Sequence, residues 1–191
     1  MIDKFSLGKL NPSPAAINFT KFDHFNGLHI RSLSIEDLAH RIKPFFEEKG
    51  YPADDETLLK IAPIIQERIQ GLDDAPTLAG FFFEETIDPN PDELVVKGLD
   101  AAASLELARK ITAILSGVTD MKPETAEPPM REFVESSGLK AGQVFGLVRI
   151  AVTGQKVSPP LFESMEIIGK EKVIRRMQQA IRLLEAMVER A

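Results

Sequence analysis

The sequence predicts a mainly α-helical protein made of two small helical subdomains. Three observations support this fold class. Apolar residues recur at helical spacing, helix caps stand where they are expected, and no segment shows the sustained alternation of a half-buried strand. The run VFGLVRIAV, residues 144–152, is the one strand-like stretch, and its flanks are helical. The two helical halves are of similar size, and no repeat of fixed period relates them.

The first predicted helix follows an irregular beginning. Residues 1–34 are expected to be loop with short elements, including a turn at the Asn-Gly pair of FNGL, residues 25–28. In residues 34–50, Ser34 and Asp37 form the Ser-x-x-acid pattern of a helix start. The apolar face of this helix is expected to consist of Leu38, Ile42 and Phe45.

Two further helices and a boundary complete the first half. Residues 56–69 carry apolar residues at helical spacing, and Pro63 should kink this helix or start it. Residues 75–83 are a third helix candidate. The segment ETIDPNPDEL, residues 85–94, holds two prolines among acidic residues and is the best candidate for a domain boundary.

The second half begins with an amphipathic helix in residues 94–118 and ends with the clearest helix of the chain, residues 170–190. Short helices separated by glycine-containing turns are expected between them. The apolar stripe of the last helix consists of Val173, Ile174, Met177, Ile181, Leu184 and Met187.

Composition limits the class of protein. Of the 191 residues 43% are hydrophobic, which is enough to build a core, and the chain has no cysteine, which excludes disulfides and thiol catalysis. No apolar run approaches the roughly 18 residues that a membrane helix needs. We therefore expect a cytoplasmic protein without a membrane partner.

Charge is distributed unevenly along the chain. The net charge is −6, but residues 73–142 carry 6 basic and 14 acidic side chains, whereas residues 143–191 carry 8 and 5. The last fifty residues thus form a basic segment on an acidic body. An anionic partner would be guided to that segment and repelled from the middle of the chain.

No catalytic or metal site is predicted. The three histidines, His24, His29 and His40, lack a metal-ligand spacing, and exposed or partly buried imidazoles are the simpler interpretation. The sequence contains no Gly-x-Ser-x-Gly elbow, no phosphate-binding Walker loop and no GxGxxG motif. Its paired carboxylates stand in polar tracts, where adjacent acids are usually solvated.

The basic segment is the most informative feature. Arg149 follows an apolar stretch, and the loop QKVSPPLF, residues 155–162, offers Ser158 as a hydrogen-bonding group. Its apolar residues, expected at the surface, are Pro159, Leu161 and Phe162. Unpaired bases are recognised by such apolar faces beside fixed polar groups. The phosphates could be held by Lys170, Lys172, Arg175 and Arg176.

Two other interpretations fit the same residues. The segment can be an ordinary loop followed by a helix with a solvated basic face. It can also be a helical module that binds an acidic protein partner through the basic helix 170–190.

Several segments resemble one protein family. The run GQVFGLVRIAVTGQKVSPPLFESMEIIGKEKVIRRM, residues 142–177, closely resembles the C-terminal anticodon-binding region of bacterial glutamyl-tRNA synthetases. Residues 21–31 (KFDHFNGLHIR), 12–19 (PSPAAINF), 64–72 (IIQERIQGL) and 81–83 (FFF) also resemble family segments, in the family's order. At two positions the chain departs from the pattern, because His24 and His29 replace the usual Trp and Tyr.

The catalytic motifs of that family are missing from this sequence. Neither His-x-Gly-His nor Lys-x-Ser-Lys, which handle ATP in the family's Rossmann domain, occurs here. The resemblance therefore implies the tail of a glutamate–tRNA ligase that does not aminoacylate by itself. ATP and magnesium would belong to the missing catalytic domain, and this chain would need no cofactor.

The resemblance also implies a fold, a partner and site residues. Residues 1–34 would end a stem-contact region, and residues 35–85 and 86–191 would be two helical anticodon-binding subdomains. The partner would be tRNA(Glu), bound by a monomer, without DNA. Arg68 would read the third anticodon base. The other residues that contact the anticodon would be Arg149, Ser158, Pro159 and Leu161. The residues that contact the tRNA backbone would be Lys156, Lys170, Lys172 and Arg175.

Overall fold

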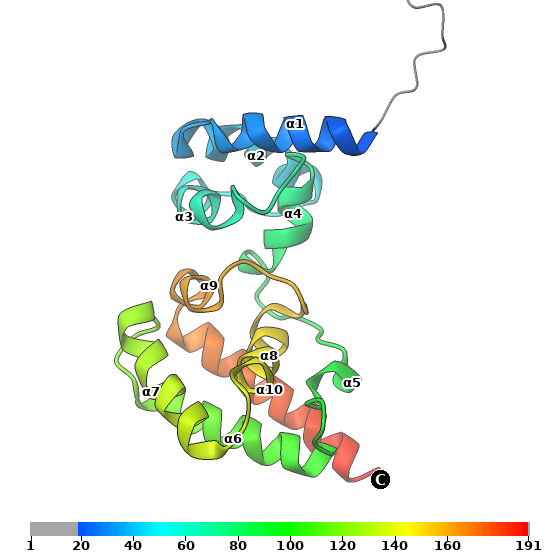
Figure 1. Cartoon of the computed structure of the whole chain (residues 1–191), viewed down its shortest axis with the longest axis vertical. Helices are drawn as coiled ribbons and strands as arrows, with labels where there is room; N and C mark the ends of the chain where they lie inside the picture. The colour runs from blue at the N-terminus through cyan, green and yellow to red at the C-terminus, as the bar shows by residue number, and fades with distance from the viewer. Residues whose placement is uncertain (1–18, 191) are drawn as a thin grey trace, which may run out of the picture.

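The structure is a computed structural model that describes residues 19–190, with side chains from residue 21 onward. All regular elements in this range are helices, so the mainly α prediction is confirmed. They form two groups stacked along the long axis of the molecule, α1–α4 and α5–α10 (Figure 1). The PSPAAIN segment of the family resemblance and most of the expected stem-contact region lie outside the described residues. The proposed subdomain boundaries stay a prediction.

Helix α1 (Phe19–Arg31) replaces the loop and turn expected there. The Asn26-Gly27 pair, which predicts a turn locally, lies inside this helix. The reason is a tertiary contact, since Asn26 Nδ2 donates a hydrogen bond of 2.6 Å to the carbonyl of Gln70. A contact across 44 residues thus overrides the local turn preference.

Helix α2 (Ile35–Glu48) begins as predicted. Ser34 is its N-cap, and the Ser34 hydroxyl accepts a hydrogen bond of 3.1 Å from the Asp37 backbone N–H. Phe46 is fully buried, whereas Phe45, which the apolar pattern placed on the core face, is only partly covered. The predicted core face is therefore wrong at its last member.

The remaining elements of the first group are short. Helix α3 (Asp55–Ile65) ends four residues before the predicted end, with Pro63 in its last turn. Helix α4 (Asp74–Ala79) continues into a 3₁₀ turn, η3 (Gly80–Phe82). Ile69 is buried although it lies outside α3, so apolar periodicity continues past the helix end.

The second group is built around α10, which packs most extensively on α6 (Figure 1). The strand-like run 144–152 lies inside α8, as its helical flanks indicated. Residues of the α10 stripe are buried or packed against the core, as predicted. The helices of this group are α5 (Pro91–Leu94), α6 (Ala101–Gly117), α7 (Pro123–Ser137), α8 (Ala141–Thr153), α9 (Leu161–Ile168) and α10 (Lys170–Val188).

A buried arginine joins the two groups. The Arg176 side chain on α10 is 1% exposed. Its Nη2 donates hydrogen bonds to the carbonyls of Phe81 (2.8 Å) and Glu84 (2.5 Å), and its Nη1 donates to the carbonyl of Val152 (2.6 Å). One guanidinium therefore ties the end of the first group to α8 and α10.

This burial corrects the expectation that Arg176 holds a phosphate, because the side chain does not reach the surface. Burial lowers the pKa of Arg176 to about 10, and the charges of Glu84 and Glu85 oppose that shift. At neutral pH the guanidinium stays protonated and keeps its donors.

Two glutamine contacts support the same joint. Gln155 Nε2 donates to the carbonyl of Thr77 (2.9 Å), and Gln179 Nε2 donates to the carbonyl of Ile87 (2.6 Å). Helix α9 also contacts α3 and η3. The two groups are thus held together by polar and apolar contacts.

Across residues 19–190, no helix combines the length and apolar character that crossing a membrane requires.

Replacing Arg176 by Met should destabilise the protein. The substitution removes a buried donor and leaves three carbonyls without it, which should lower the free energy of unfolding by about 2–4 kcal/mol. Urea unfolding followed by circular dichroism measures this change.

Arg175→Met is the matched control. Its side chain is 52% exposed and pairs with the exposed Glu85, so the free energy of unfolding should stay nearly unchanged. Equal destabilisation by the two variants would contradict the assigned role of Arg176.

Candidate nucleic-acid interface

Two chain connections meet on one face of the molecule. One joins α3 to α4 and carries Arg68; the other joins α8 to α9, residues 154–160. They enclose a shallow cavity of about 630 Å³, named here the loop cavity. Its lining residues are Arg68, Ile69, Gln70, Asp74, Thr77, Leu78, Gln155, Lys156 and Val157.

The position of Arg68 is fixed by the residues around it. Ile65 and Ile69 on either side are buried, and the Arg68 N–H donates to the carbonyl of Ile65 at 2.8 Å. The Asp74 carboxylate accepts hydrogen bonds from the N–H groups of Gln70 (3.0 Å) and Gly71 (2.8 Å). The backbone is anchored on both sides, while the Arg68 side chain is exposed.

Arg149 lies beside Arg68 and holds the second connection. Its Nη1 donates to the Ser158 hydroxyl (2.5 Å) and to the carbonyl of Pro159 (3.1 Å), with a longer contact to the carbonyl of Ser158 (3.4 Å). Burial lowers the pKa of Arg149, and the nearby positive charge of Arg68 lowers it further. Among the described side chains, neither arginine forms an ion pair with a carboxylate.

The start of the loop is fixed by a second set of contacts. Gly154 ends α8 with φ of 72°, a left-handed conformation that favours glycine. The Thr153 hydroxyl donates to the carbonyl of Arg149 (2.7 Å) and accepts from the N–H of Gln155 (3.2 Å). The prolines at 159 and 160 restrict the other end. Both ends of the loop are therefore restrained by local contacts and by proline.

The surface of the loop differs from the expected one. Pro159, Leu161 and Phe162 were expected to offer apolar surface, but all three are buried, with Leu161 6% and Phe162 8% exposed. Ser158 is 2% exposed, and its hydroxyl is occupied by Arg149. These side chains shape the loop from inside, so the expectation that they are exposed is wrong.

The exposed part of the loop is its tip. Val157 is 73% exposed, and sequence analysis did not single it out. The available signal was an apolar residue between Lys156 and the rigid Ser-Pro-Pro turn. Lys156 is also exposed, lies 3.2 Å from Glu93, and lines the loop cavity as its expected role requires.

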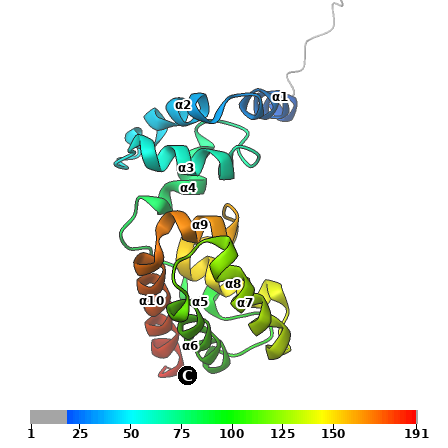
Figure 2. The same cartoon turned by 90° about the vertical axis from the view of Figure 1, so that its left-hand side faces the viewer.

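The other residues that were predicted to contact the tRNA backbone do not lie beside the α8–α9 loop. Lys170 Nζ donates to the carbonyls of Ser116 (2.9 Å) and Val118 (2.5 Å), at the end of α6. The start of α10 and the α8–α9 loop lie on different sides of α9 (Figure 2). The expected single basic cluster is therefore wrong.

Lys172 and Arg175 are engaged at the joint between the helix groups. Lys172 lies 3.4 Å from a carboxylate oxygen of Glu85, and Arg175 pairs with the same carboxylate. Arg175, followed by Lys172, lowers the pKa of Glu85. Both cations are thus paired within the protein.

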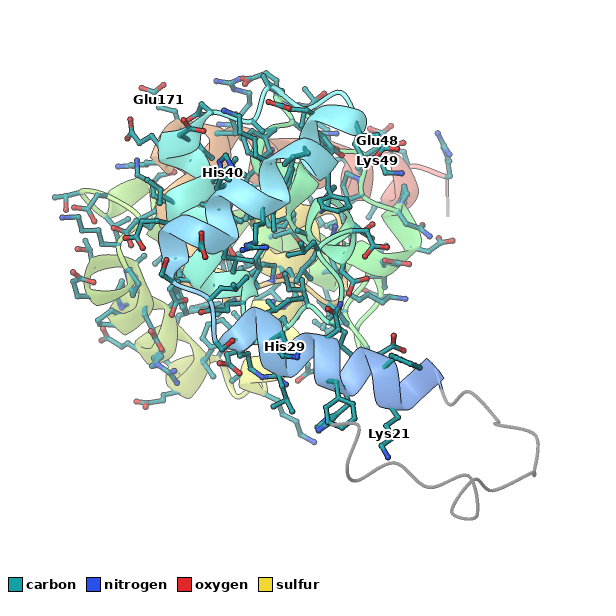
Figure 3. The ribbon with its side chains drawn as sticks, turned by 90° about the horizontal axis from the view of Figure 1, so that it is seen from above. Lys21, His29, His40, Glu48, Lys49 and Glu171 are labelled. Atoms are coloured by element: carbon teal, nitrogen blue, oxygen red, sulfur yellow. The ribbon has the colours of Figure 1, made fainter. Side chains whose placement is uncertain are left out.

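The histidines do not form a metal site. His29 lies on α1 and His40 on α2, with side chains on separate helices (Figure 3). His24, His29 and His40 are all exposed. Over residues 21–190, no group of three or more His, Asp or Glu side chains is placed to hold a metal ion.

The loop cavity combines the elements that bind unpaired nucleotides. Arg68 presents a planar donor fork that suits a base edge, and Val157 presents an apolar surface. Lys156 adds a mobile positive charge that suits a phosphate.

Comparisons with known proteins identify a family for this chain. The protein family described as "Anticodon binding domain" matches residues 37–181. Glutamate–tRNA ligase from Roseiflexus sp. (strain RS-1) is 38% identical over 186 residues, covering 94% of this chain and 37% of the relative. The enzyme of the same name from Chloroflexus aurantiacus is 37% identical over 194 residues, covering 97% of this chain and 39% of the relative.

A solved structure has a similar fold. The glutamate tRNA ligase from Elizabethkingia meningosepticum superimposes with a TM-score of 0.75 at 26% identity, covering 95% of this chain and 36% of that chain. This chain thus spans less than two fifths of the length of these relatives. The match over residues 37–181 and the identities of 37–38% show that the chain belongs to the family of anticodon-binding domains found in glutamate–tRNA ligases.

Proposed function

We propose that this chain is the anticodon-recognising part of a glutamate–tRNA ligase and that it binds tRNA(Glu). The observation that carries the proposal is the exposed guanidinium of Arg68 at the loop cavity, beside Lys156 and Val157, with no carboxylate paired to Arg68 among the described residues. An unpaired arginine beside an exposed lysine and an exposed apolar tip suits an RNA loop better than an uncharged ligand. Family membership supports the same partner.

Within this proposal the residues have different roles. Arg68 contacts the edge of the third anticodon base, and Val157 contacts the face of a base. Arg149, Ser158 and Pro159 hold the loop shape from below, and Leu161 anchors it. Lys156 contacts a phosphate, whereas Lys170, Lys172 and Arg175 are engaged in contacts within the protein.

The chemistry of aminoacylation is proposed to belong to a different region of such a ligase. The described residues offer no metal-binding group, and the sequence has no ATP-handling motif of the family. ATP and magnesium are therefore assigned to a catalytic domain, and this chain alone is proposed to be inactive. The proposed place of action is the cytoplasm, and the proposed state is a monomer.

The alternative of a basic helix that binds an acidic protein finds less support. Lys170, Lys172 and Arg175 on α10 already contact carbonyls or Glu85. An acidic partner would have to displace these internal contacts.

Replacing Arg68 by Ala should weaken binding of tRNA(Glu) by about 1–3 kcal/mol, the contribution of one good base contact. The loss should be smaller for a tRNA whose third anticodon base is changed, because that contact is already missing. Gel-shift titration at one fixed salt concentration measures both affinities.

Arg182→Ala is the matched control, since Arg182 is an exposed arginine on α10. It should bind tRNA(Glu) like the unmodified protein. The residue assignment fails if Arg68→Ala binds as tightly as this control.

The two classes of lysine can be separated by salt dependence. Lys156→Ala should make the slope of log K against log salt shallower by roughly 0.7–0.9, because one phosphate contact is lost. Lys172→Ala should leave the slope unchanged, because the Lys172 side chain is only 23% exposed and lies away from the loop cavity, whereas the Lys156 side chain is 67% exposed and lines it. Titrations at several salt concentrations measure the slopes, and the reverse result would place the RNA backbone along α10 instead.

A further inference from the structure

A second and larger cavity lies between α5 and α8. It has a volume of about 750 Å³ and is named here the α5–α8 cavity. Its floor is largely apolar, formed by Val95, Val96, Leu147 and Ile150, and two glycines of α8, Gly142 and Gly146, leave it open. A nucleobase needs such an apolar surface to cover its face.

The rim of the cavity is positively charged on balance. Lys97, Lys140 and Lys156 line it together with Asp92 and Glu93. Glu93 is paired with Lys156 at 3.2 Å, whereas no carboxylate of residues 21–190 pairs with Lys97 or Lys140. Two lysines with unpaired side chains therefore gather here, in the part of the chain that is most acidic. This local excess of positive charge suits a phosphate.

The α5–α8 cavity adjoins the loop cavity at Lys156. Lys156 lines both cavities, so its side chain lies between them. An extended RNA strand bound at the loop cavity would enter the α5–α8 cavity next. Of the residues that line this cavity, the predicted site residues included only Lys156.

We infer that the α5–α8 cavity binds the base of one further unpaired nucleotide of the tRNA anticodon loop, with a neighbouring phosphate held by Lys97 or Lys140. This inference rests on the proposed function. It adds a binding site to that function, at residues 95–97 and 140–150, with an RNA nucleotide as its ligand.

Gly146, which leaves the cavity open, allows a test that keeps the fold intact. A Cβ at Gly146 would meet no heavy atom within 4 Å, and Gly146 lies in a regular helix. Gly146→Leu should therefore fill part of the cavity without lowering the melting temperature, because leucine has a better helix propensity than glycine. The matched control is Gly117→Leu, at the exposed end of α6, where an added Cβ is equally free.

The probe is an RNA hairpin with the anticodon stem and loop of tRNA(Glu), bound to the full 191-residue chain and followed by fluorescence anisotropy. Gly146→Leu should raise Kd roughly 5- to 150-fold, the range for loss of one base contact. Gly117→Leu should leave Kd unchanged.

Abasic substitutions in the same hairpin identify the nucleotide. With the unmodified protein, removing the base that occupies the cavity should weaken binding. With Gly146→Leu, the same abasic substitution should cause no further loss.

The outcomes separate this inference from the proposed function. If Arg68→Ala weakens binding but Gly146→Leu binds like the unmodified protein, the inference fails and the proposed function stands. The inference also fails if Gly146→Leu weakens binding of every abasic hairpin by the same factor. In that case no single base occupies the cavity. If the unmodified protein does not bind the hairpin, both fail.

Discussion

The structure depends on one buried charge-assisted contact, between Arg176 and carbonyls of both helix groups. The first group carries Arg68, and the second carries the α8–α9 loop, so neither group forms the loop cavity alone. Arg176 reaches from α10 to the end of the first group and to the last turn of α8, two residues before the loop. Together with the Gln155 and Gln179 hydrogen bonds and the packing of α9 on α3, Arg176 therefore holds the two parts of the proposed RNA surface facing each other.

Arginine has the same structural use at a second place. Arg149 is partly buried and donates to a hydroxyl and carbonyls of the loop, as Arg176 does at the joint between the helix groups. The planar guanidinium offers several donors in fixed directions, and it stays charged at neutral pH. Only Arg68, of these three, has its guanidinium exposed to a ligand. Basic residues thus divide into those that build the surface and those that contact the partner.

Much of the fold followed from local sequence signals, whereas the site depended on long-range contacts. Ser34 caps α2 through a residue three positions away, and such short-range patterns are visible in the sequence. Helix α1 was not predicted, because Asn26 forms a hydrogen bond with Gln70, which lies far along the chain. The family resemblance pointed to Arg68 and Arg149, but it could not indicate that Ser158 faces inward and Val157 outward. Side-chain direction in a loop is set by its partners in space.

The acceptors at Arg176 are all backbone oxygens, from Phe81, Glu84 and Val152. Every amino acid supplies the same carbonyl, so the side chains at these three positions can change during evolution without loss of an acceptor. Among the four residues of this contact, only Arg176 contributes through its side chain. Substitutions at the acceptor positions therefore keep the hydrogen bonds to Arg176 and are limited instead by packing, because Phe81 and Val152 are themselves buried.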